Sequence, residues 1–204
     1  MKKSLAVLVM LFALQAGSLA LAQEKKLAFH LSGGASAPLT NQEFRDLYSS
    51  GPNGSLGLDV RVSPKLAVGA ELGYSSFGLD RKGLLDLIEM EDNDAIKIKG
   101  GDLSVVEVLG VGKYYPKSVD ANTSFYLLAG AGLSASSIAK LEVTTPAGDL
   151  ESEAVSESNF MALGGIGLQH KFGAKWNAYF EVRYTRVFSD EAFSYLPVRI
   201  GTTF

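Results

Sequence analysis

The sequence predicts an all-β protein, an eight-stranded antiparallel up-and-down transmembrane β-barrel. Three observations support this fold class. Apolar residues alternate with polar or small residues in eight consecutive segments, a period that is typical of strands with two different faces. The connections between these segments tend to alternate between short and long. The chain also begins with the features of an export signal.

The N-terminal 22 residues are interpreted as a signal peptide. Two lysines precede an apolar run over residues 5–14, and Ala-Leu-Ala at 20–22 matches a cleavage site. A membrane anchor helix is the alternative, but it needs a longer apolar run of roughly 20 residues. We therefore expect residues 23–204 to form one barrel domain. The lack of cysteine excludes a lipoprotein and disulfides, and the net charge of −3 argues against a nucleic-acid binder.

The strand-like segments have the length that a tilted strand needs to cross a bilayer, roughly 9–11 residues. They cover residues 27–37, 55–62, 66–77, 103–115, 124–135, 159–172, 176–188 and 194–204. In the second segment, Leu56 and Leu58 lie on one face of the expected strand and Asp59 lies on the other. The fourth is less regular, because Glu107 shares a face with Val105, so its facing stays open. Short turns at one end and long loops at the other are typical of membrane barrels.

Charged residues lie on the face opposite the apolar one. They are Asp59, Arg61, Glu71, Glu181, Arg183 and Arg199, with Glu107 and Lys113 added from the irregular segment. An arginine facing lipid at the midplane costs about 2–4 kcal/mol, and an eight-stranded bore is too narrow for the bulky apolar face. We therefore expect these charges in the lumen, with acids and bases balanced, and the apolar side chains against lipid. The alternative is the solvated face of a soluble sandwich.

Aromatic residues cluster near both ends of the expected strands. Phe29, Tyr114, Phe125, Phe172, Trp176 and Phe204 fall near the short-turn end, and Tyr74, Phe77, Phe160, Tyr184 and Phe188 fall near the long-loop end. Two such bands are typical of the two membrane–water interfaces.

The closing stretch SYLPVRIGTTF ends on Phe204, with Leu196, Val198 and Ile200 on one parity. This ending resembles the C-terminal assembly signal of bacterial outer-membrane barrels, although Thr202 departs from the usual apolar or aromatic residue. The resemblance implies that the barrel-assembly machinery reads Phe204. Lipid would then cover the terminal aromatic ring.

Further stretches resemble the small outer-membrane β-barrel family of the OmpA/OmpX type. They are GVGKYYP (110–116), SFYLLAGAGLS (124–134), GGIGLQHKF (164–172) and NAYFEVRYTR (177–186). The resemblance covers nearly the whole mature chain and implies a bacterial outer-membrane location, with outer-membrane lipid and lipopolysaccharide as partners. The family's patterns specify fold well and activity poorly.

We expect no catalytic, cofactor-binding or metal site. His30 and His170 are the only histidines, and neither has further ligands at metal-binding spacing. Some barrels of this type are lipid A deacylases, with a serine two positions from the histidine; this chain has Phe172 at that position. The glycine runs lie inside expected strands, which favours packing in a crowded lumen over phosphate loops.

The long loops are rich in acidic residues, and residues 83–90 are expected to form a short helix. These features favour a structural or surface-interaction scaffold that presents acidic extracellular loops from a barrel with a filled polar lumen. The loops' partner stays unidentified. A small porin-like channel for small solutes is the alternative, although eight strands leave little room for water.

Overall fold

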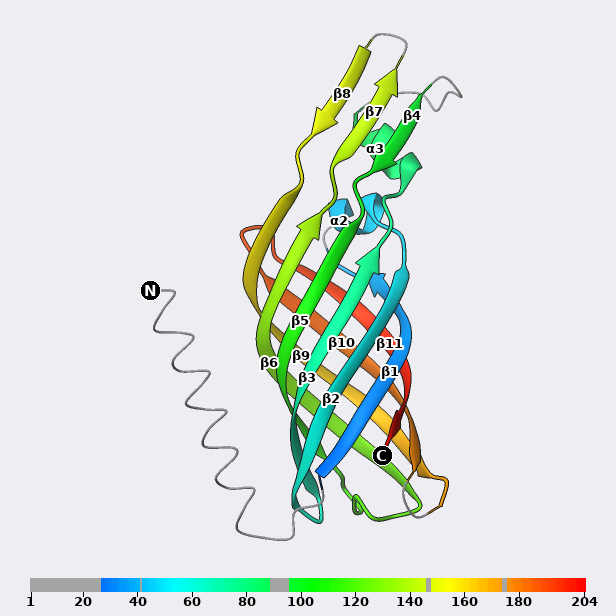
Figure 1. Cartoon of the computed structure of the whole chain (residues 1–204), viewed down its shortest axis with the longest axis vertical. Helices are drawn as coiled ribbons and strands as arrows, with labels where there is room; N and C mark the ends of the chain where they lie inside the picture. Colours follow the sequence, from blue (N-terminus) through cyan, green and yellow to red (C-terminus); the bar gives the residue numbers. More distant parts are fainter. Residues whose placement is uncertain (1–26, 41, 89–95, 146–147, 174–175) are drawn as a thin grey trace, which may run out of the picture.

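The structure is a computed structural model that describes residues 27–40, 42–88, 96–145, 148–173 and 176–204 (Figure 1). The expected signal peptide lies outside these residues. None of the described helices is long and apolar enough to cross a bilayer.

Eight antiparallel strands form a closed barrel, which confirms the predicted fold class. They are β1 (Leu27–Pro38), β2 (Gly51–Ser63), β3 (Leu66–Phe77), β5 (Leu103–Tyr114), β6 (Thr123–Ile138), β9 (Val155–Lys171), β10 (Asn177–Phe188) and β11 (Phe193–Thr203). Each strand pairs with its neighbours in chain order, and β11 pairs with β1 to close the ring. Closure leaves no barrel strand with a free edge.

The two faces of the strands differ as the alternation predicts. Leu31 and Ile200 point outward and are 55% and 67% exposed, whereas Glu71 points inward and is 2% exposed. The irregular strand β5 turns Glu107 inward and Val108 outward. The apolar outside and charged inside are therefore opposite to the arrangement of a small soluble barrel.

The outward aromatic residues form bands at both ends, with one exception. Phe29 and Trp176 are exposed near the short turns, and Tyr184 and Phe188 are exposed near the long loops. Phe77 was expected in the second band, but it is fully buried. It shares its parity with Glu71 on β3, and its ring therefore points into the barrel.

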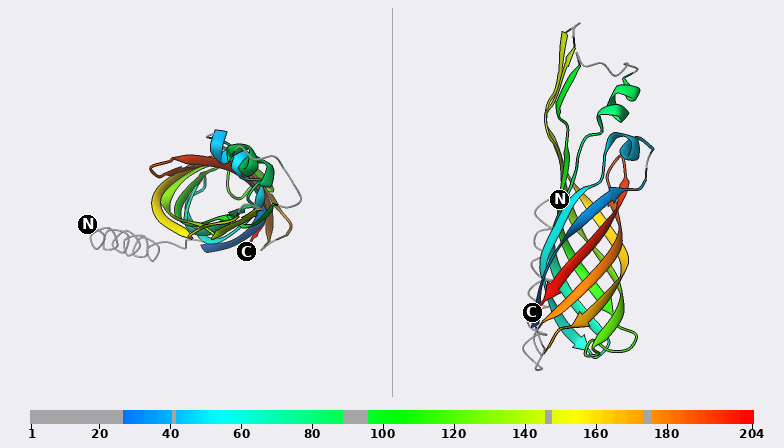
Figure 2. Two further views of the ribbon diagram at one scale, coloured as in Figure 1. Left: turned by 90° about the horizontal axis from the view of Figure 1, so that it is seen from above. Right: turned by 90° about the vertical axis from the view of Figure 1, so that its right-hand side faces the viewer.

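The long loops fold above the barrel (Figure 2). They contain the helices α2 (Gln42–Leu47) and α3 (Arg81–Leu87) and a sheet of β4 (Lys97–Gly100), β7 (Leu141–Thr145) and β8 (Gly148–Ser152). The alternation did not predict this sheet, because its strands are only four or five residues long.

A small apolar cluster joins α3 to the projecting sheet. Leu84 and Leu85 pack with Ile96 and Val143, all of them buried. The helix begins after Asp80, whose Oδ1 accepts hydrogen bonds from the backbone N–H groups of residues 82 and 83, a typical N-cap. This cap explains why the helix begins earlier than the expected residue 83, and its last expected residues, 89 and 90, lie outside the described part.

Candidate functional site in the barrel interior

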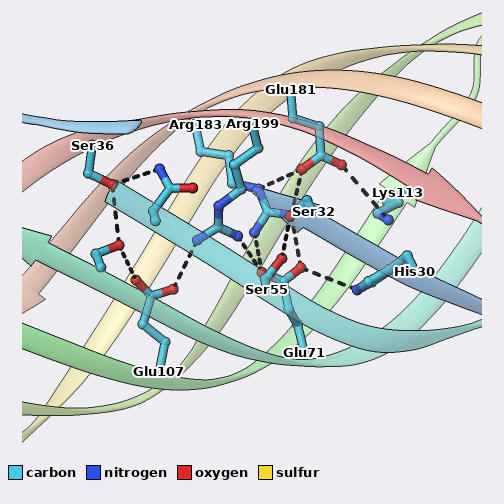
Figure 3. A network of polar contacts seen from close by, with 12 residues as sticks. His30, Ser32, Ser36, Ser55, Glu71, Glu107, Lys113, Glu181, Arg183 and Arg199 are labelled. Atoms are coloured by element: carbon cyan, nitrogen blue, oxygen red, sulfur yellow. Dashed lines mark hydrogen bonds and ion pairs between the residues drawn. The ribbon is translucent and has the colours of Figure 1, made fainter. Parts of the chain in front are cut away.

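Glu71 of β3 lies at the centre of a buried group of charged side chains, here called the ionic layer (Figure 3). Arg183 Nη1 and Nη2 donate to its two carboxylate oxygens at 2.7 and 2.9 Å. Arg199 Nη1 also donates to Glu71 Oε1, at 2.6 Å. Because β3 and β10 are not neighbours in the barrel, these bonds join opposite walls across the bore.

A second part of the ionic layer is centred on Asp59 of β2. Lys113 Nζ donates to Asp59 Oδ2 at 2.7 Å. His30 lies between two carboxylates, with Nδ1 3.3 Å from Asp59 Oδ2 and Nε2 3.6 Å from Glu71 Oε2. The imidazole therefore connects the two parts of the layer.

The remaining acidic side chains complete the layer. Glu181 Oε2 accepts a hydrogen bond from Arg183 Nε at 2.7 Å. Glu107 Oε2 lies 3.5 Å from Arg199 Nη2, and its other oxygen accepts a bond from the Tyr195 hydroxyl. A carboxylate buried without a partner is strongly destabilising, so these bonds are what allows the charges to stay inside.

Seven of the eight charged residues that the sequence assigned to the lumen are buried together in this layer. They are Asp59, Glu71, Glu107, Lys113, Glu181, Arg183 and Arg199. The eighth, Arg61, lies apart: its Nη1 donates to Asp120 Oδ2 at 2.6 Å, and its side chain is 25% exposed. The four buried carboxylates thus meet Lys113, Arg183, Arg199 and the imidazole of His30.

An aromatic cluster fills the bore between the ionic layer and the long loops. Phe44 of α2 reaches into the barrel mouth, with its ring centroid 5.5 Å from Phe77 and 4.9 Å from Phe193. Phe77 packs edge-on against Tyr195 at 5.4 Å. The lumen therefore holds apolar rings as well as the small and charged groups expected there.

Tyrosines and a polar turn fill the short-turn end. Tyr126 donates to Glu181 Oε1 at 2.6 Å, and its ring lies 5.1 Å from that of Tyr115. Below them, Asp120 of the turn bonds Arg61 and lies 3.6 Å from Lys171 Nζ. Side chains thus obstruct the bore at three levels: the aromatic cluster, the ionic layer and this end.

Inward-facing glycines make room for the large side chains. Gly167 lies directly across from Tyr126, and a Cβ added to it would lie 2.2 Å from Tyr126 Cζ. Gly57 lies across from His30, where an added Cβ would lie 2.4 Å from Nε2. At these two positions the lumen is filled by one large side chain that lies across from a residue with no side chain.

Sequence reasoning missed the place of His30 and Phe44. His30 was considered only as a metal ligand, although its parity on the first strand already put it on the inward face. Phe44 lies in a loop, where alternation gives no information about facing. Its position depends on contacts with strands distant in the chain.

His170 lies on the outer surface near the short turns. Its Nδ1 lies 2.8 Å from Thr123 Oγ1, and its ring packs against Phe172 at 4.8 Å. In the described part of the chain, no carboxylate hydrogen bond orients this imidazole. No cluster of three or more metal-ligating side chains occurs among the described residues.

A family model described as the outer membrane protein beta-barrel domain matches residues 4–201. The chain belongs to this family. It is therefore a bacterial outer-membrane protein, with its apolar outer surface against lipid. By the usual orientation of this family's fold, the short turns are periplasmic and the long loops extracellular.

Solved structures show the same fold for other outer membrane β-barrels. A major outer membrane protein from Thermus thermophilus is 10% identical, with a TM-score of 0.54 over 88% of this chain and 99% of that one. Neisserial surface protein A is 11% identical, with a TM-score of 0.52 over 89% and 98% of the two chains. No curated protein matches the chain. At these identities the likeness concerns the fold alone.

Proposed function

We propose that this outer membrane β-barrel is a closed, non-catalytic scaffold that presents its folded extracellular loops to an external partner. The observation that carries the proposal is the obstructed bore. The Arg183–Glu71 pair crosses the bore with both side chains about 1% exposed, and the ring of Phe44 covers Phe77 above it. A solute path would require both obstructions to move.

The projecting sheet supports the presentation role. Its strands β7 and β8 pair in register, with Glu142 opposite Glu151. Lys140 Nζ bonds both carboxylates at 3.0 Å, and these carboxylates raise its pKa. Together with α3, the sheet forms a folded unit above the barrel (Figure 2). An ordered loop loses less conformational entropy on binding than a disordered one, which favours recognition.

The porin-like alternative makes an opposite prediction for conductance. We expect the purified protein in planar lipid bilayers to show no sustained open level. The comparison is the double variant Glu71→Ala/Arg183→Ala. It removes both partners of the ion pair that crosses the bore, so neither of these two charges is left without the other. A reproducible open level in the wild-type protein, at the same voltage and salt, would overturn the scaffold proposal in favour of the channel.

The presentation role has its own test. Replacing residues 140–153 with a short Gly-Ser turn removes most of the projecting sheet and leaves the barrel strands intact. We expect this variant to keep its resistance to unfolding in detergent and to lose adhesion of bacteria expressing it to surfaces that the wild type colonises. Unchanged adhesion across all tested surfaces would assign the loops no presenting role.

A further inference from the structure

The lipid-facing surface of the eight described barrel strands carries a single Asp, Glu, Lys or Arg side chain, that of Arg186. Its strand neighbours Thr185 and Val187 are about 1% and 0% exposed and point into the barrel, so Arg186 points out. Across the sheet it pairs with Ala162 and Ser194, which carry no charge. A lone charge on a surface selected for contact with lipid requires an explanation.

Arg186 lies at the extracellular edge of the membrane. It falls between Tyr184 and Phe188 on the outward face of β10, within the aromatic band that marks this interface. Its guanidinium carbon lies 5.8 Å from the Phe188 ring centroid, and Phe188 packs against Phe160 at 5.7 Å. The cost of a lipid-facing arginine is smallest at this depth, where lipid headgroups meet the protein.

The polar groups around Arg186 hold no acidic counter-ion. In the described part of the chain, no ion pair joins it to a carboxylate. The Tyr184 hydroxyl donates to Ser194 Oγ at 2.9 Å and also interacts with Arg186. This leaves most of the guanidinium N–H donors available, and their planar fork matches a phosphate group.

We propose that Arg186 binds a phosphate group of lipopolysaccharide in the outer leaflet. The guanidinium supplies two parallel donors to the phosphate oxygens. The rings of Phe188 and Phe160 pack against the upper part of the acyl chains. The site is a lipid contact on the barrel wall, separate from the loops and from the lumen.

The test measures lipid binding to the intact protein in detergent micelles, with native mass spectrometry as the readout. The probes are bisphosphorylated lipid A, the same lipid with both phosphates removed, and inorganic phosphate. We expect the wild type to retain bisphosphorylated lipid A about tenfold more tightly than the Arg186→Gln variant does, as for a charged hydrogen bond. The variant Arg186→Lys should keep part of the affinity, and Arg45→Gln, a change of the same type on the exposed helix α2, should keep all of it.

The probes separate the possible sources of phosphate. Equal retention of the phosphate-free lipid by the wild type would overturn the proposal without any variant, and so would full competition by inorganic phosphate at the lipid's concentration. Equal retention of bisphosphorylated lipid A by the wild type and Arg186→Gln would also overturn it. If Arg186→Gln does not fold, the comparison of the two lipids on the wild type decides the question.

Discussion

Arg183 and Glu71 form a two-point ion pair across the barrel bore, with N–O distances of 2.7 and 2.9 Å. The two residues lie 112 positions apart in the chain and on strands that are not neighbours. A bidentate pair has a fixed geometry as well as a favourable charge. The pair therefore fixes the distance between β3 and β10 on opposite sides of the barrel.

Replacing Arg183 with alanine should be strongly destabilising. The change leaves Glu71 and Glu181 buried without their main partner, and a broken buried pair costs about 3–5 kcal/mol. Urea unfolding in detergent micelles, followed by tryptophan fluorescence, measures the loss. Arg45→Ala, whose side chain is 61% exposed, is the control and should have almost no effect. Equal midpoints for the two variants would contradict the structural role of the pair.

The strand glycines should tolerate substitution according to the face on which they lie. Gly167→Ala places a methyl group against Tyr126 and disturbs its bond to Glu181, so we expect a loss of about 1–3 kcal/mol. Gly164→Ala is the matched change on the same strand, where the nearest atom to an added Cβ is 4.0 Å away. Heat-induced mobility shifts on gels compare the two. Similar melting temperatures would show that the lumen adapts freely.

The two histidines should differ sharply in importance. His30→Phe removes a polar partner from both Asp59 and Glu71, and we expect about 1–3 kcal/mol of destabilisation. His170→Phe changes an exposed ring next to Phe172 and should be close to neutral. Both variants are measured by the same urea titration. A greater loss for His170→Phe would mean that the inner imidazole contributes little to the ionic layer.

Weakening the apolar cluster between α3 and the sheet of β4, β7 and β8 should destabilise that sheet and leave the barrel folded. Leu85 is 1% exposed, and Leu85→Ala removes the packing between α3 and Val143, which costs about 2–5 kcal/mol locally. Leu87→Ala, at a position 58% exposed, is the control. Hydrogen exchange should accelerate at residues 141–145 and stay unchanged in β10. Acceleration throughout the barrel strands would mean that loops and barrel unfold together.

The positions of the barrel strands could be predicted from the sequence because each strand has one face toward lipid and one toward a crowded interior. Leu66–Phe77 was predicted with the bounds that β3 has. The facing of β5 was not readable, because Val105 and Leu109 share the inward face with Glu107. Alternation distinguishes faces only when they differ in polarity, and here both faces are partly apolar. Phe77 was misplaced for another reason: it was assigned to the aromatic band by its place at the strand end, although it shares the parity of the inward-facing Glu71.

The interior charges could be assigned to the lumen from the sequence, but not their partners. Arg61 has the same parity as Asp59 and differs from it only in depth, which periodicity does not measure. Depth depends on the tilt and register of several strands at once. His30 takes a place in the layer because β1 sets it opposite Gly57, a relation between two strands that a single segment does not reveal.

The ring is completed where Phe29 and Phe204 exchange backbone hydrogen bonds at 3.2 and 2.9 Å. The first and last strands of the barrel are thus each other's closing partners. Such long-range pairing makes folding slow and leaves both edges open to other chains until the final strand arrives. A polypeptide halted before β11 would keep two unpaired sheet edges. Protecting the chain from other chains on its way to the membrane therefore matters most until this last strand has paired.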